Sequence, residues 1–160
     1  MTANFHQRGK LWLTTGFLVL ILDRIIKWYF LTNVSLNLSE THGSGLASLF
    51  SLSFYLNPKI FLIVSPPLII TQLLVTVVWV VFLVYVWVCY RQNKSGHVVF
   101  FIWTVLGGAS NLYDRWRFDG VIDYFNLGFL PTFNLADIMI IGGLVGYLVS
   151  FKFIKLKVIK

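Results

Sequence analysis

The chain is poor in charged residues and has a single cysteine, and both scarcities narrow what it can be. Charged residues make up 12% of its 160 residues and hydrophobic residues 58%, whereas soluble domains have roughly 25% and about 45–50%. The composition therefore excludes an ordinary soluble protein and predicts an integral membrane protein. The lone Cys89 excludes an internal disulfide and a cysteine-based metal cluster, and we expect it to face lipid at the end of a span.

Four apolar runs predict an all-α fold of four transmembrane helices. Each run is near the about 20 residues that an α-helix needs to cross about 30 Å of hydrocarbon. The runs cover roughly 11–31, 67–90, 98–114 and 133–153. The connections at 32–66 and 115–132 would be outer loops of a single membrane domain over 1–160. The first run contains Asp23 and Lys27 and lacks a small-x-small cleavage site, so we interpret it as a retained span.

The distribution of basic residues predicts the orientation. Eight of them lie before the first run, between the second and third, and at the end of the chain: Arg8, Lys10, Arg91, Lys94, Lys152, Lys155, Lys157 and Lys160. The other two loops contain only Lys59 and Arg117, with Arg115 at the boundary. Because cytoplasmic loops carry the excess of lysine and arginine, both termini are expected in the cytoplasm.

Acidic residues are scarcer still, and their positions indicate a functional region. Three of the six are Asp114, Asp123 and Asp137, which lie in or beside apolar segments where an ionisable group is costly unless function requires it. In the predicted orientation, Asp123 falls in the short outer loop and Asp137 near the outer start of the last span. A rise of about 1.5 Å per residue places Asp23 and Asn111 about 18–20 Å from the inner edge. We therefore expect these polar side chains to converge near the outer interface.

Two carboxylates at one poorly solvated place have a natural chemistry. Asp123 and Asp137 could not both ionise easily there, so the pair would share one proton. One member could then activate a water molecule while the other donates a hydrogen bond to a carbonyl group, as in aspartic proteases. General acid–base help of this kind contributes typically about 10²- to 10⁴-fold in rate. The pair is thus our candidate for catalysis.

Five sequence blocks resemble a known family. They are Asp23-x-x-x-Lys27, Asn57, Gly107-Gly108-x-x-Asn111-x-x-Asp114-Arg115, Gly120-Val121-x-Asp123-Tyr124 and Phe133-Asn134-x-Ala136-Asp137. In this order and combination the chain resembles the bacterial lipoprotein signal peptidases, the signal peptidase II family. The resemblance implies a membrane aspartic endopeptidase whose catalytic pair is Asp123 and Asp137. Its substrate would be a prolipoprotein whose lipobox cysteine already bears diacylglycerol, and the reaction would use no metal or cofactor.

The resemblance also implies a set of supporting residues. They are Asn57, Asn111, Arg115, Asn134, Asp23, Lys27, Gly108, Asp114 and Ala136. Of these residues, Asn111, Arg115 and Asn134 would orient the site and the substrate backbone. Asp23 and Lys27 would support the site between helices.

The surroundings of the site are implied as well. The family has a small extracytoplasmic β-cradle and a short surface helix, which here would fall roughly in 34–65. In this range Lys59 replaces a glycine that the family usually has two residues after the position of Asn57. A long charged side chain would then stand where a close backbone approach to substrate is expected. We expect a monomer of the bacterial inner membrane, active at the outer face, with lipidated prolipoproteins and membrane lipids as partners and not nucleic acid.

Simpler structural interpretations of some residues remain open. Asp23 and Lys27, four residues apart on a helix, could only neutralise each other. The Asp114–Arg115 pair could form an interfacial cap and a salt bridge. The Asp119–Gly120 pair is typical of a turn.

Two other functions remain open too. One is a homologue that binds lipoproteins without cutting them, which the replacement at Lys59 leaves possible. The other is a small four-span transporter subunit in which buried acids relay protons or cations. A relay would distribute ionisable residues through the membrane depth, whereas the acidic residues here cluster at one face.

Overall fold

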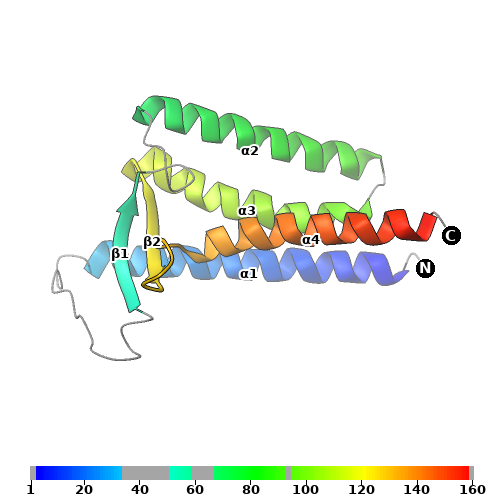
Figure 1. The fold of residues 1–160 in the computed structure, drawn as a ribbon, viewed down its shortest axis with the longest axis horizontal. Coiled ribbons are helices and arrows are strands. Elements are labelled where there is room, and N and C mark those ends of the chain that lie inside the picture. Colours follow the sequence, from blue (N-terminus) through cyan, green and yellow to red (C-terminus); the bar gives the residue numbers. More distant parts are fainter. Residues whose placement is uncertain (1–2, 34–50, 59–66, 93–94, 159–160) are drawn as a thin grey trace.

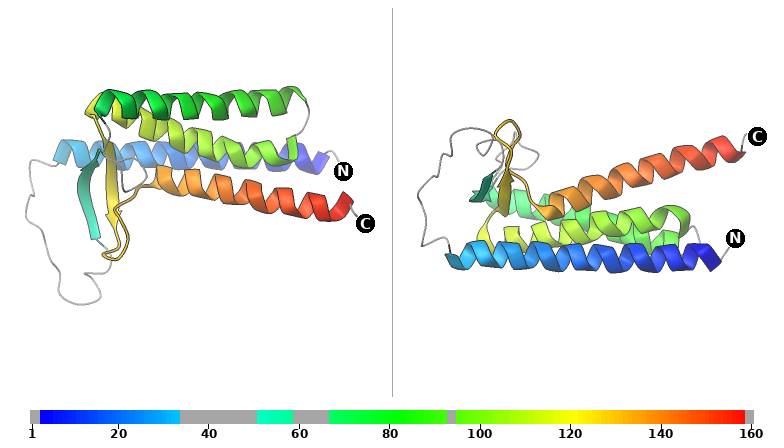
Figure 2. Two further views of the ribbon diagram at one scale, coloured as in Figure 1. Left: turned by 45° about the horizontal axis from the view of Figure 1, so that its top comes forward. Right: turned by 90° about the horizontal axis from the view of Figure 1, so that it is seen from below.

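A bundle of helices with a small sheet across one end makes up the fold. The computed structural model describes residues 3–33, 51–58, 67–92 and 95–158. The elements are α1 (Ala3–Asn33), β1 (Ser51–Asn57), α2 (Leu68–Arg91), α3 (Ser95–Phe118), β2 (Val121–Asn126) and α4 (Leu135–Val158). The strands lie at one end of the bundle, which we call the sheet end (Figure 1). The start of α1 and the end of α4 are both at the opposite end, which we call the terminal end (Figure 2).

Each predicted apolar run lies on one helix, but the helices and the runs end at different residues. Helix α1 begins at Ala3 and α4 ends at Val158, because polar and basic residues can extend a helix beyond its apolar part. Among the described residues, α2 is the one helix that is long and apolar enough by itself to cross a membrane, and Leu135–Ser150 of α4 is a shorter apolar helix. A membrane crossing by all four helices therefore stays a prediction.

Helix α3 occupies the centre of the bundle and contacts α1, α2 and α4. Its buried residues recur every three or four positions and so form one face of the helix. They include Phe101, Thr104, Gly107, Ser110, Asn111 and Asp114. This face is aromatic towards the terminal end and polar towards the sheet end, so the polar part of the core is confined to one end of the molecule.

Glycines allow α3 and α4 to approach each other closely. A Cβ atom on Gly107 would overlap the carbonyl oxygen of Ala136, and one on Gly143 would overlap Oγ1 of Thr104. Because a side chain at either position would force the two helices apart, these glycines set the distance between α3 and the helix that carries Asp137.

The sheet joins two segments that are far apart in the sequence. Strands β1 and β2 pair antiparallel, with Tyr55 opposite Asp123. The backbone of Phe125 in β2 also exchanges hydrogen bonds of 2.8 and 3.1 Å with Phe133, just before α4. Asp123 lies in the connection between α3 and α4, which contains a strand that the sequence did not predict, because the apolar segment around Asp123 pairs with β1.

The predicted β-cradle is present in part. Strand β1 lies within the expected range 34–65, while its partner β2 follows α3. The short surface helix expected in that range, and Lys59, lie outside the described residues.

The prediction for Cys89 is wrong. Its side chain is buried rather than facing lipid. One turn earlier in α2, the Tyr85 hydroxyl lies 2.9 Å from the Tyr147 hydroxyl of α4, and the Tyr85 ring packs on Phe101 of α3. Cys89 is on this inward face of α2, where its small apolar side chain fits.

Candidate active site

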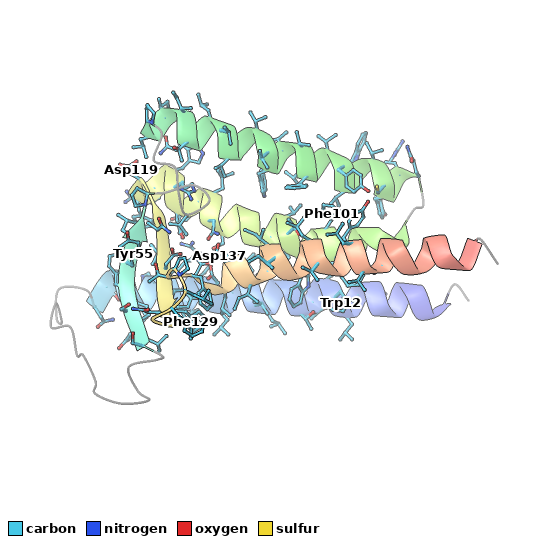
Figure 3. The ribbon with its side chains drawn as sticks, viewed as in Figure 1. Trp12, Tyr55, Phe101, Asp119, Phe129 and Asp137 are labelled. Carbon is cyan, nitrogen blue, oxygen red and sulfur yellow. The ribbon has the colours of Figure 1, made fainter. Side chains whose placement is uncertain are left out.

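The two aspartates predicted to form a pair both lie at the sheet end. Asp123 is on β2 with 2% of its surface exposed, and Asp137 is in the first turn of α4. Figure 3 shows Asp137 and Tyr55 towards the sheet end, whereas Phe101 lies further towards the terminal end. The backbone hydrogen bonds between β2 and the segment before α4 bring the two aspartate-bearing elements together.

Asn134 links the two carboxylates directly. It precedes the first residue of α4, and its Oδ1 accepts a 2.9 Å hydrogen bond from the backbone N–H of Asp137. In return, Oδ2 of Asp137 accepts a 3.2 Å bond from the backbone N–H of Asn134. This reciprocal pair is a capping box. The Nδ2 of the same Asn134 donates to Oδ1 of Asp123 at 2.8 Å, so one buried residue holds both aspartates.

Two further asparagines hold the remaining carboxylate oxygens. Asn111 donates from Nδ2 to Oδ1 of Asp137 at 2.7 Å, and Asn57 donates from Nδ2 to Oδ2 of Asp123 at 2.9 Å. All four carboxylate oxygens therefore accept a hydrogen bond from an amide. Because amides carry no net charge, they orient the pair without forcing both members to ionise.

Burial changes the acidity of Asp123. Loss of water raises the pKa of this carboxyl from 3.8 to about 7, and the nearby charge of Asp137 also raises it, whereas the hydrogen bonds from Asn57 and Asn134 lower it. The pair can therefore retain a proton near neutral pH, as acid–base catalysis by two carboxyl groups requires.

A buried ion cluster lies next to the pair. Lys27 Nζ is 3.0 Å from Oδ2 of Asp23 and 2.8 Å from Oδ2 of Asp114, and Arg24 forms a second ion pair with Asp114. The two cations balance the two anions. Lys27 also donates to Oδ1 of Asn111 at 3.0 Å, which connects the cluster to the Asp137 side of the site.

The predicted pairing of Asp23 with Lys27 within α1 is confirmed. Asp114 forms ion pairs with Lys27 and Arg24, both on α1, and its Oδ2 accepts a 3.4 Å bond from the backbone N–H of Ile122. Asp114 is fully buried, and α1 supplies the cations that compensate its charge.

Arg115 and the turn that follows α3 border the site. The half-buried Arg115 interacts electrostatically with Asp123 and Asp137, and its backbone carbonyl accepts a 2.8 Å bond from Nε2 of Gln72. Asp119 has a positive φ of 62° and is exposed. The predicted turn at this position is confirmed.

The other supporting residues differ in their relation to the site. Ala136 is fully buried and its backbone N–H donates to Oδ1 of Asp23 at 3.3 Å. Gly108 instead faces Trp79 of α2, so its contact is with another helix and not with the aspartates. In the part of the chain that the structure describes, no group of three histidine, cysteine, aspartate or glutamate residues is placed to hold a metal ion.

Sequence reasoning missed three members of the polar network. Arg24, Ser110 and Tyr124 were not proposed as site residues. Ser110 Oγ donates to Oδ2 of Asp23 at 2.6 Å, and the Tyr124 hydroxyl donates to Oδ1 of Asp23 at 2.9 Å. The available signal was their position in the sequence, next to Asp23, Asn111 and Asp123.

Comparisons with known proteins show the family of the chain. A family model described as signal peptidase (SPase) II matches residues 15–153. The chain belongs to the signal peptidase II family. This family member is 31% identical over 127 residues to a lipoprotein signal peptidase of Halothermothrix orenii, covering 79% of this chain and 84% of the relative. It is 29% identical over 129 residues to one of Clostridium novyi, covering 78% and 85%.

Solved structures share the fold of this signal peptidase II family member. A bacterial membrane enzyme determined at 2.3 Å resolution matches with a TM-score of 0.71 and 15% identity, covering 91% of this chain and 87% of that one. A second, determined at 1.9 Å resolution, matches with a TM-score of 0.69 and 14% identity, covering 91% and 92%. The chain therefore has the fold of these membrane enzymes, although α2 is the one described helix that is long and apolar enough by itself to cross a membrane.

Proposed function

We propose that this signal peptidase II family member is a membrane aspartic endopeptidase that removes the signal peptide from diacylglyceryl-modified prolipoproteins. The family match over residues 15–153 and the likeness to lipoprotein signal peptidases support this reaction. The observation that carries the aspartic mechanism is the pair of carboxylates, Asp123 and Asp137, joined through the amide and backbone of one buried asparagine.

The mechanism follows from a pair that holds one proton. The ionised carboxylate takes a proton from water, and the water oxygen attacks the carbonyl carbon of the peptide bond before the lipidated cysteine. The protonated carboxyl gives its proton to the carbonyl oxygen, which yields a neutral gem-diol.

Collapse of this intermediate restores the pair. One gem-diol hydroxyl returns a proton to the newly ionised carboxylate, the C–N bond breaks, and the cysteine nitrogen takes a proton from the other carboxyl. The products are the carboxyl group of the signal peptide and the free amine of the lipidated cysteine. The pair again holds one proton.

The proposal includes four spans, both termini in the cytoplasm, and a site at the outer face of the bacterial inner membrane. The basic residues before the first apolar run, between the second and third runs, and at the end of the chain support this orientation by the positive-inside rule. The start of α1 and the end of α4 at one end of the bundle, opposite the sheet, are consistent with it. The ion cluster supports a crossing by α1, because Asp23 and Lys27 neutralise each other inside the protein.

Neither alternative function is favoured. A proton or cation relay needs ionisable groups along the path. In the part of the chain that the structure describes, the buried acids all belong to the network at the sheet end: Asp23, Asp114 and Asp123. A homologue that binds without cutting would not need two carboxylates with a shared proton. A cleavage assay distinguishes such a homologue from a peptidase.

The test is cleavage of a diacylglyceryl-modified prolipoprotein by the full chain reconstituted in lipid. Asp123→Asn and Asp137→Asn should each lower kcat at least about 10²- to 10⁴-fold, because either change removes the acid–base pair. Asp119→Asn is the matched control and should cleave normally, since Asp119 lies in an exposed turn with a positive φ that asparagine also adopts. Normal cleavage by Asp123→Asn would overturn the pair, and binding without cleavage by the unmodified chain would indicate a non-cleaving homologue.

A further inference from the structure

Tyr124 has a hydroxyl group that the proposed chemistry does not use. The side chain is fully buried on β2, immediately after Asp123. Its hydroxyl donates to Oδ1 of Asp23 in α1 at 2.9 Å and accepts a 3.0 Å bond from the backbone N–H of Leu135 in α4. One oxygen atom therefore joins a strand to two helices.

The Tyr124 hydroxyl and its partner Asp23 accept hydrogen bonds from backbone N–H groups at the N-terminus of α4. The first backbone N–H groups of a helix have no partner within the helix and need one from elsewhere when they are buried. Here the N–H of Leu135 donates to Tyr124, that of Ala136 to Oδ1 of Asp23, and that of Asp137 to Oδ1 of Asn134. Two of the three acceptors thus belong to the Tyr124–Asp23 pair.

Asp23 is in turn fixed by its own partners. Its Oδ2 is 3.0 Å from Lys27 Nζ and accepts a 2.6 Å bond from Ser110 Oγ. The carboxylate is fully buried. Because Asp23 is held on several sides, the hydroxyl that bonds it is held as well, and the position of Tyr124 is tied to α1 and α3.

We infer that Tyr124 is a positioning residue that sets the separation of the two candidate catalytic carboxylates. Asp123 is its neighbour in β2, and Asp137 lies two residues beyond the Leu135 amide that it holds. The hydroxyl therefore connects the strand that carries one aspartate to the helix turn that carries the other. This inference rests on the proposed function.

The test is the substitution Tyr124→Phe, which removes the hydroxyl and keeps the ring. The ring contacts with Phe30, at a centroid distance of 6.0 Å, and with Phe125, at 4.8 Å, can then remain. We expect kcat for the lipidated precursor to fall about 10- to 100-fold with KM within about twofold, because a small displacement of reacting groups costs rate rather than affinity. Tyr90→Phe is the matched control, since Tyr90 is exposed on α2, and should leave kcat unchanged.

A second measurement does not depend on catalysis. Hydrogen exchange of the backbone amides of Leu135 and Ala136 should accelerate about fivefold or more in Tyr124→Phe, because the first loses its acceptor and the acceptor of the second loses a partner. Amides in the middle of α4, such as that of Gly143, should exchange as before.

The possible outcomes are distinguishable. A normal kcat per folded molecule in Tyr124→Phe, with or without a lower thermal stability, would overturn the positioning role. If the unmodified chain does not cleave, the proposed function fails. In that case unchanged exchange at Leu135 and Ala136 overturns the link between β2 and α4, whereas accelerated exchange supports it.

Discussion

The charges of the buried ion cluster are separated from the candidate pair by neutral amides. Asn111 lies between the cation of Lys27 and Asp137, because its Oδ1 accepts from Lys27 and its Nδ2 donates to Asp137. Lys27 itself is neutralised by Asp23 and Asp114. A cation in direct contact with the pair would favour ionisation of both members. The amides hold the carboxylates in place and still allow them to share a proton.

The pH dependence of cleavage should report the contact between Asn57 and Asp123. The alkaline limb of kcat follows loss of the shared proton and should lie near pH 7, because burial raises the pKa of Asp123 to about 7. Asn57→Ala removes an amide that favours the ionised form, so the pKa should rise further and the limb should move up by about one pH unit. Rates measured from about pH 5 to about pH 10 would show this displacement.

The control for this prediction is Asn33→Ala. Asn33 also has an amide that donates a hydrogen bond, but the acceptor is the carbonyl of Tyr29 in its own helix. The limb should therefore stay in place. A limb that stays in place for Asn57→Ala as well would show that ionisation of Asp123 does not control the rate.

The same pKa shift has a consequence for stability. The folded protein keeps a proton on Asp123 up to about pH 7, whereas an unfolded chain releases it near pH 4. This group therefore lowers the free energy of unfolding as pH rises from about 4 to about 7, and its effect is constant above and below that window.

At the residue scale, the sequence and its family resemblance predicted the two acids and the three asparagines that hold them, but not the hydroxyl groups that hold Asp23. Asp123 and Asp137 could be proposed because ionisable residues are rare beside apolar segments. Tyr124 and Ser110 could not, because their role depends on hydrogen bonds to Asp23, which is distant in the sequence. A common residue such as serine or tyrosine becomes part of a site only when the fold brings its hydrogen-bonding partner next to it.

The two adjacent glycines in α3 show that the geometry of the helix determines which contacts a residue makes. Gly107 and Gly108 are neighbours in the sequence, and the second was proposed to support the site. Successive helix positions point in different directions, and here Gly107 faces Ala136 of α4 while Gly108 faces Trp79 of α2. Gly107 is therefore the one that controls the approach of α4.

Gly107→Ala should destabilise the protein and lower its activity. The added methyl group would overlap the carbonyl oxygen of Ala136 and displace the first turn of α4, which carries Asp137. We expect a loss of about 1–3 kcal/mol in the free energy of unfolding, the usual cost of overpacking. Thermal unfolding in detergent and kcat for the lipidated precursor would measure both effects.

Gly142→Ala is the matched control for this substitution. It lies in α4, and a Cβ atom there would meet nothing within 4 Å. Because alanine favours a helix by about 1 kcal/mol over glycine, this variant should be as stable as the unmodified protein or more so. Equal stability of Gly107→Ala and Gly142→Ala would contradict the close approach of α3 and α4.

The elements themselves were predictable to different degrees. Apolar runs of suitable length located the helices, but not their ends, which depend on polar residues such as those that follow Ser150 in α4. The strand around Asp123 was not predicted, because its partner β1 precedes α2 and α3 in the chain. Pairing between distant segments leaves no periodic signal in either one.

At the scale of the whole molecule, the polar network is confined to one end of an otherwise apolar bundle. Asp23, Ser110 and Asp123 belong to its buried part at the sheet end, whereas α2 exposes Val77, Val81 and other apolar side chains along its length. A bundle of this kind in a bilayer would place its hydrolytic groups at a fixed depth. The substrate bond that reaches them is then selected by how deeply the substrate is anchored.

Lipidation of the precursor should therefore decide whether it is cleaved. Two acyl chains hold the modified cysteine at the lipid interface, since each buried methylene group contributes about 0.8 kcal/mol to membrane binding. This anchor would bring the preceding peptide bond to Asp123 and Asp137, and its binding energy would offset the cost of ordering the peptide there.

A precursor of the same sequence without diacylglycerol should show kcat/KM lower by at least about 100-fold in the reconstituted assay. A precursor with its diacylglyceryl cysteine moved several residues downstream should be cut as poorly as the unlipidated one, because its anchor holds the wrong bond at the depth of the pair. Equal cleavage of all three precursors would contradict selection by depth while leaving the carboxylate chemistry intact.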